Sequence, residues 1–214
     1  MGRIGARPLL AALGVIGSAF LGAAVSTPAR TASSASPSYT GDGRLQFPKD
    51  YRTWVYLSSG MDMSYLEAAQ APGMSAFDNV FVNREAWTSF QQTGTWPDKT
   101  VMVLEVRRGQ QNGSINKHGR FQTDRLGAEI HVKDTARFKG GWAFFGFDGD
   151  GPGQQLPATA ACYACHQQHA AVDTTFVQFY PTLLPIAQKH GTLSAAYLAD
   201  EAAASRVPAA DPHN

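Results

Sequence analysis

The sequence of 214 residues has little net charge, only two cysteines and no internal repeat. Its 18 Lys and Arg nearly balance its 17 Asp and Glu, so the chain has no strong field that would attract nucleic acid or an anionic membrane. Two cysteines are too few for a disulfide-rich scaffold. Hydrophobic residues nevertheless make up 43% of the chain and aromatic residues 11%, which indicates a packed globular domain.

The first 29 residues are typical of a signal peptide. Arg3 and Arg7 supply a basic start, an uncharged run from Pro8 to Val25 follows, and small residues continue to Ala29. The run approaches the length of a membrane-spanning helix, so an uncleaved anchor is the alternative. Its many Ala, Gly and Ser residues favour cleavage. We therefore expect residues 1–29 to be removed and the chain to be exported, for example to a periplasm, without stable membrane insertion.

Composition divides the remaining chain into one folded domain between two segments that are expected to be flexible. Residues 30–44 are rich in small and polar residues and predict a disordered lead-in. Large apolar side chains begin with Phe47, so we expect a single domain over residues 45–200. Residues 201–214 predict a flexible tail.

Apolar periodicity within the domain predicts an α+β fold: a mainly antiparallel β-sheet with flanking helices. The helix or strand character of residues 51–58 stays open. A helix is expected between the cap residue Asn83 and Gly94, residues 109–119 read as a loop, and the chain becomes helical from Cys162 onward. The expected strands are residues 79–83, 101–106, 128–133 and 141–147, and the last helix is residues 193–205.

The strand over residues 101–106 is apolar on both faces. Val101 and Val103 point to one side, and Met102 and Leu104 point to the other. This pattern indicates either burial on both sides or a binding site on one of them.

The most informative motif is C-x-x-C-H, formed by Cys162, Cys165 and His166. This is the attachment signature of c-type haem. Two thiols three residues apart on one helical turn reach the two vinyl groups of a single haem, and the adjacent imidazole becomes an axial ligand of the iron. The motif therefore predicts one covalent haem c on a C-terminal helix, with His166 as the metal ligand.

Three other uses of these cysteines are weaker. A thioredoxin-like pair belongs early in a βαβ unit, whereas this pair follows a loop near the C-terminus. A zinc site built from Cys162, Cys165, His166 and His169 would crowd four ligands into eight residues. A structural disulfide across so short a loop would constrain little of the unfolded chain.

A second protein ligand for the iron is not evident. No Met follows Met102, and His169 lies on the same helix as His166. We interpret the earlier methionines as packing residues and the other histidines as surface or structural residues; these are Met61, Met63, Met74 and Met102, and His118, His131 and His190. The sequence thus predicts a five-coordinate iron with an apolar distal pocket.

Several segments resemble, in order, the cytochrome P-460 family, which includes cytochrome c′-beta. The similar segments are residues 47–54, 80–83, 97–101, 132–134, 137–138, 141–145, the C-x-x-C-H motif, 173–176 and 179–181. The resemblance implies a mainly antiparallel fold, a homodimer, and one covalent haem with His166 as proximal ligand.

The resemblance also bears on activity. Enzymatic members oxidise hydroxylamine and cross-link their haem to a Lys, and Leu104 stands at that position here. The chain is therefore more similar to cytochrome c′-beta, which implies binding of nitric oxide or a related small ligand, or electron transfer to a partner protein. Hydroxylamine oxidation is the alternative. Phe77 and Leu104 are the candidates for the distal wall, and Asp78 is interpreted as a turn residue.

Overall fold

The computed structural model describes residues 2, 36–63 and 74–206 of the chain. The expected signal peptide, residues 1–29, lies outside the described residues apart from residue 2, and so does most of the expected tail. No helix in these ranges combines the length and the apolar character needed to cross a bilayer.

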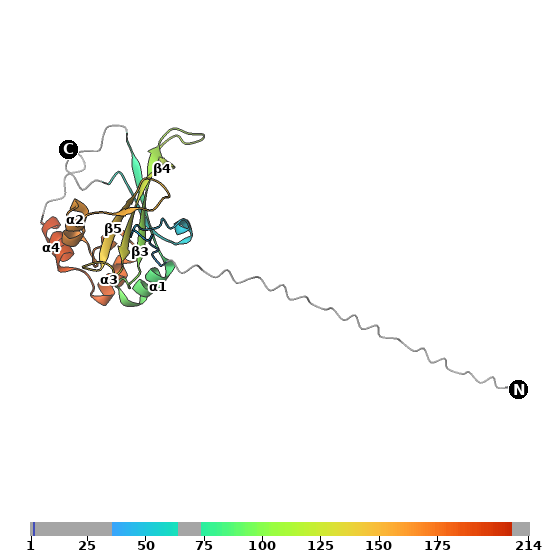
Figure 1. The fold of residues 1–214 in the computed structure, drawn as a ribbon. Coiled ribbons are helices and arrows are strands. Elements are labelled where there is room, and N and C mark those ends of the chain that lie inside the picture. Colours follow the sequence, from blue (N-terminus) through green and yellow to red (C-terminus); the bar gives the residue numbers. More distant parts are fainter. Residues whose placement is uncertain (1, 3–35, 64–73, 207–214) are drawn as a thin grey trace. The chain divides into compact units, whose positions relative to one another are not determined.

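Six antiparallel strands follow one another in chain order to form a single sheet (Figure 1). Each strand pairs with the strands that precede and follow it in the sequence, so the sheet is an antiparallel meander. The strands are β1 (Val55–Met61), β2 (Ala76–Val82), β3 (Val101–Gln110), β4 (Phe121–Lys133), β5 (Trp142–Phe147) and β6 (Gln154–Gln155).

The helices are short and lie mostly in the C-terminal part of the chain. They are α1 (Arg84–Thr93), α2 (Ala161–His169), α3 (Leu184–His190) and α4 (Ala195–Ala204), with single 3-10 turns η1 (Tyr51–Thr53) and η2 (Val177–Phe179). The predicted α+β fold is confirmed.

The central part of the sheet is buried on both faces. One face carries Val82, Met102 and Trp142 and packs against α1, α3, α4 and the segment that follows α2. The other face carries Val103, Ile130 and Phe145, and the N-terminal residues Leu45, Phe47 and Tyr51 cover it. The two apolar faces expected for residues 101–106 are thus both used: Val101 and Val103 enter the second core, and Met102 enters the first.

Local signals set the limits of α1 as predicted. Asn83 precedes the helix in an extended conformation, and Gly94 ends it with a φ of 70°, the left-handed conformation that glycine adopts without strain. Asn83 also accepts a hydrogen bond from the Val101 backbone at 2.8 Å, which ties the start of the helix to β3.

The observed elements differ from the expected ones at three places. Residues 36–44, expected to be disordered, include Tyr39, which bridges to Leu45 and packs edge-on against Phe138. Strands β3 and β4 extend into the expected loop 109–119 and the residues after it. Their outer halves are mostly exposed and polar, so they lack the alternation that marks a half-buried strand.

The third difference concerns the C-terminal part. Helix α2 ends at His169, and residues 170–176 form an irregular segment before η2. Val172 in this segment is buried in the core by the irregular chain and not by a helix. Helix α4 continues to Ala204, so the first residues of the expected tail are helical.

Candidate functional site

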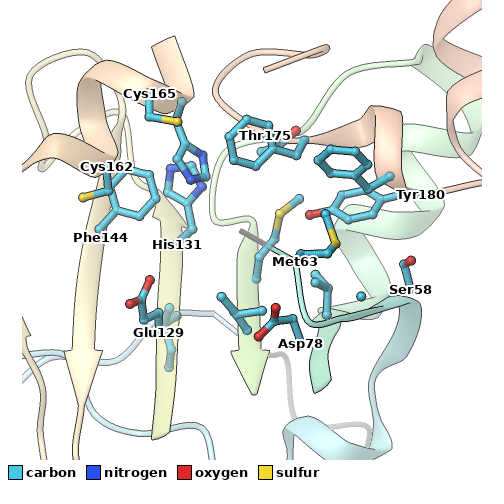
Figure 2. Close-up of a pocket in the computed structure, with 18 of the residues that line it drawn as sticks. Ser58, Met63, Asp78, Glu129, His131, Phe144, Cys162, Cys165, Thr175 and Tyr180 are labelled. Atoms are coloured by element: carbon cyan, nitrogen blue, oxygen red, sulfur yellow. The ribbon is translucent and has the colours of Figure 1, made fainter. Parts of the chain in front are cut away.

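A cavity of about 490 Å³ lies between the first face of the sheet and the C-terminal segments (Figure 2). This volume is within the range of small-molecule and cofactor sites. Its wall is mainly apolar and includes Val80, Met102, Leu104, Phe144, Phe176 and Phe179. The three residues of the C-x-x-C-H motif also line it.

Helix α2 presents the two cysteines of the motif to the cavity. Cys162 and Cys165 are three residues apart, so they lie on one side of the helix. Both thiols are free and partly buried. Burial raises the pKa of the Cys162 thiol above its usual value. The pair is therefore positioned to attach a group inside the cavity.

The ring of His166 is held in one orientation. Its Nδ1 lies 2.7 Å from the backbone carbonyl oxygen of Thr174. A carbonyl oxygen only accepts, so Nδ1 carries the hydrogen and the Nε2 lone pair is left for a metal. Phe144 and Phe176 pack against the ring, with centroids 4.6 and 4.2 Å away. Burial lowers the pKa of His166, which favours the neutral form that binds metals.

The loop after α2 supplies the carbonyl group that orients His166. Asp173 has a φ of 53°, which turns the chain, and Val172 and Thr175 bridge across the turn. The Trp96 indole donates a hydrogen bond of 2.7 Å to the Thr175 hydroxyl and fixes the loop to the core. The sequence gives no direct signal for the contact between His166 and the Thr174 carbonyl oxygen, because a backbone carbonyl group leaves no side-chain signature.

His131 is a residue of this site that sequence reasoning undervalued. It lies on β4, is buried, and stacks on Phe144 with ring centroids 3.9 Å apart. Its Nε2 is 3.3 Å from the Thr174 hydroxyl, and its ring centroid is 5.3 Å from that of His166. Burial holds the pKa of His131 well below its usual value, so the ring is neutral. It contributes to the packing of the His166 imidazole.

The strands place the two predicted distal residues differently. Leu104 lines the cavity beside Val80, its paired residue on β2. Phe77 is not among the described residues of the cavity wall. Side chains alternate along β2, so Phe77 shares the far face with Phe81 while Asp78 and Val80 face the cavity.

Asp78 lies within β2 and not in the turn expected for it. Burial raises the pKa of its carboxyl group, and the like charges of Glu129 and Asp62 add to this shift. Figure 2 shows Asp78 and Glu129 at the same end of the cavity. A proton-holding group is thus available in a wall that is otherwise mainly apolar.

The methionines interpreted as packing residues have two different environments. Met61 and Met74 are more than half exposed, whereas Met63 and Met102 line the cavity. Met102 is buried in the core between the sheet and helices α1, α3 and α4.

The alternatives for the cysteine pair find no support in the described residues. No three His, Cys, Asp or Glu side chains there lie close enough together to hold a metal ion, and His169 pairs with Asp200 instead of joining His166. The strands are antiparallel, unlike the βαβ unit of a thioredoxin-like pair.

The donor set fits a haem. Two free thiols, an imidazole with its Nε2 available and a mainly apolar cavity occur together, and Cys162, Cys165 and His166 would hold the group. The fold and the site thus define a haem-binding protein. The family model of Cytochrome P460 matches residues 48–177, more than half of the chain, and the chain belongs to this family, whose members bind haem. A comparison with curated proteins gave no match.

Proposed function

We propose that this protein is an exported c-type cytochrome with one covalent haem, which binds nitric oxide or a similar small ligand, transfers electrons, or does both. Cys162 and Cys165 form the thioether bonds, and His166 is the proximal ligand. A haem held by these residues would lie against the mainly apolar wall of the cavity, in line with the five-coordinate site inferred from the sequence. Export to a periplasm and assembly as a homodimer are parts of the same proposal.

The observation that carries the proposal is the hydrogen bond between His166 Nδ1 and the Thr174 carbonyl oxygen. It fixes the tautomer that a metal-binding histidine needs, next to the two thiols that would attach the haem. When bound, the haem supplies an iron centre for ligand binding and one-electron chemistry.

The cavity residues favour small, neutral ligands. Val80, Leu104 and Phe176 offer no hydrogen bond to a charged or strongly hydrated molecule, which would lose its water on entering. Nitric oxide has little hydration to lose.

Hydroxylamine oxidation is the second candidate, and the position of Asp78 favours it. Its raised pKa lets the carboxyl group hold or accept a proton at Oδ inside the cavity. The Leu at position 104 argues for the first candidate, because the resemblance assigns the cross-linking Lys of enzymatic members to this position.

The test is the optical spectrum of the purified protein, oxidised and reduced, with and without nitric oxide. We expect a haem c spectrum that shifts on addition of nitric oxide, and no sustained turnover of hydroxylamine with an artificial electron acceptor. Sustained turnover would favour the second candidate.

The matched variants are His166→Ala and His169→Ala, two histidines on the same helix. His166→Ala should abolish the normal ferrous spectrum, whereas His169→Ala should leave it unchanged because His169 is exposed and paired with Asp200. An unchanged spectrum in His166→Ala would refute the ligand role of His166.

A further inference from the structure

We propose that the Met63 thioether is an exchangeable axial ligand of the haem iron, on the face opposite His166, and that a small ligand binds by displacing it. This inference rests on the proposed function, since it requires a haem held by Cys162, Cys165 and His166.

Met63 lies across the cavity from the attachment motif. Figure 2 shows it on the side of Ser58 and Tyr180, whereas Cys162 and Cys165 lie at the opposite side. A group attached to the cysteines and held by His166 would therefore have Met63 facing its other side.

The backbone next to Met63 is anchored. Asp62 has a φ of 56°, and its carboxylate accepts hydrogen bonds from the Ser75 hydroxyl at 2.7 and 2.9 Å and from the Ala76 backbone at 2.9 Å. The Asp62 backbone also donates a hydrogen bond of 3.0 Å to the Ala76 carbonyl. These bonds fix the end of β1 to the start of β2, immediately before Met63.

Gly60 provides the space in which the thioether lies. A Cβ at position 60 would collide with the Met63 sulfur and with its Cγ. Gly60 itself lines the cavity. The absence of a side chain at position 60 therefore lets the sulfur pack directly on the β1 backbone at the cavity wall.

The chemistry of the neighbouring donors favours Met63. Ser58 and Ser59 offer neutral hydroxyl groups, which are poor ligands for haem iron, and Asp78 offers a hard carboxyl oxygen whose ionised form burial disfavours. A thioether is a neutral, soft donor and is the usual partner of histidine in cytochromes c. Met102 has the same chemistry and also lines the cavity, but it is buried in the core between β3 and the helices, so Met102→Leu is the matched variant that separates the two thioethers.

An exchangeable thioether would connect the two parts of the proposed function. With Met63 bound, the iron is six-coordinate and low-spin, which suits electron transfer. With Met63 displaced, the same position accepts nitric oxide. The five-coordinate iron expected from the sequence then describes the protein after Met63 has left.

The experiment compares wild type, Met63→Leu and Met102→Leu as haem-loaded proteins. In the wild type we expect a low-spin ferric spectrum with the near-infrared charge-transfer band of an iron–thioether bond. Met63→Leu should lose this band and become high-spin, whereas Met102→Leu should keep it. The apparent affinity for carbon monoxide, used as the neutral probe, should rise about tenfold or more in Met63→Leu, because the competing ligand is gone.

A second measurement tests the inference even if Met63→Leu folds poorly. In the reduced wild type, the methyl group of an iron-bound Met gives a strongly shifted NMR signal, which Gly60→Ala should weaken or abolish by displacing the sulfur.

Two outcomes would overturn the inference: a high-spin wild type without the shifted methyl signal, or a charge-transfer band that persists in Met63→Leu. Both leave the proposed function intact as long as the haem c spectrum still depends on His166. A colourless wild-type protein would instead refute the proposed function.

Discussion

The two faces of the sheet satisfy their buried polar groups in opposite ways. On the face covered by the N-terminal segment, the fully buried Glu105 accepts hydrogen bonds from the Tyr51 hydroxyl at 2.7 Å and from Arg107 Nε at 2.9 Å. Arg52 and Asn79 complete this network. On the cavity face, His166 keeps its Nε2 lone pair, and two thiols remain free.

This difference shows how one sheet separates stability from function. The Glu105 face is completed by the chain's own side chains, so its charge is neutralised within the fold. On the cavity side, the two thiols and the His166 Nε2 atom stay available for a bound cofactor. Substitutions on the two faces should therefore give separable effects.

The largest expected effect is on the cavity face. The double substitution Cys162→Ser and Cys165→Ser removes both thioether bonds and should abolish covalent haem attachment completely. Mass spectrometry of the denatured protein should give the mass of the polypeptide alone. Retention of the haem mass in the double variant would contradict the assigned attachment site.

The next effect should appear on the opposite face as a loss of stability. Glu105→Gln leaves Arg52 and Arg107 without their carboxylate and should lower the free energy of unfolding by about 2 kcal/mol. The haem spectrum should not change. Glu129→Gln on the cavity side is the matched control, because Glu129 is exposed and its loss should change stability by less than about 0.5 kcal/mol. Both free energies of unfolding are measured with denaturant. Equal losses of stability in the two variants would contradict the difference between the two faces of the sheet.

The smallest expected effect is a difference between Glu105 and Asp78 in how their contributions to the stability of the fold depend on pH. Burial alone would raise the pKa of Glu105, but hydrogen bonds from Tyr51 and Arg107 and the charges of Arg52 and Arg107 hold it below its usual value of 4.5. Its stabilising contribution is therefore present at neutral pH and is lost as the pH falls through the folded-state pKa.

Asp78 should behave in the opposite way. Its raised pKa means that the folded state binds the proton more tightly, so its ionisation destabilises the protein as the pH rises. Asp78→Asn should thus increase stability at neutral pH relative to wild type, with the difference shrinking in acid. The gap between Glu105→Gln and wild type should also shrink in acid but with the opposite sign. Melting curves from neutral to acidic pH measure both, and gaps of the same sign would contradict the assigned shifts.

The sequence predicted the parts of the fold that depend on local patterns. Apolar and aromatic runs located β3 and β5, alternation located the inner half of β4, and Asn83 and Gly94 delimited α1. The spacing of C-x-x-C-H identified the motif, because its chemistry depends on residues within a single helical turn.

Contacts between distant segments were not predictable in the same way. His131 approaches His166 only because β4 pairs with β5 in a register that places it against Phe144. Phe77 was expected in the distal wall, but side chains alternate along β2, and because Asp78 and Val80 face the cavity, Phe77 lies on the far face. Met63 follows a turn whose hydrogen bonds involve Ser75 and Ala76, residues that are far from it in sequence.

Helix α2 contains no buried residue, although it carries the attachment motif. Most short helices in proteins are stabilised by an apolar stripe that packs on a core, and this helix lacks one. Its anchors are polar contacts, such as the Tyr163 hydroxyl near Leu156 and the Phe144 backbone. The porphyrin would therefore be the missing hydrophobic partner of α2, so that maturation completes the core at the same time as it installs the pigment.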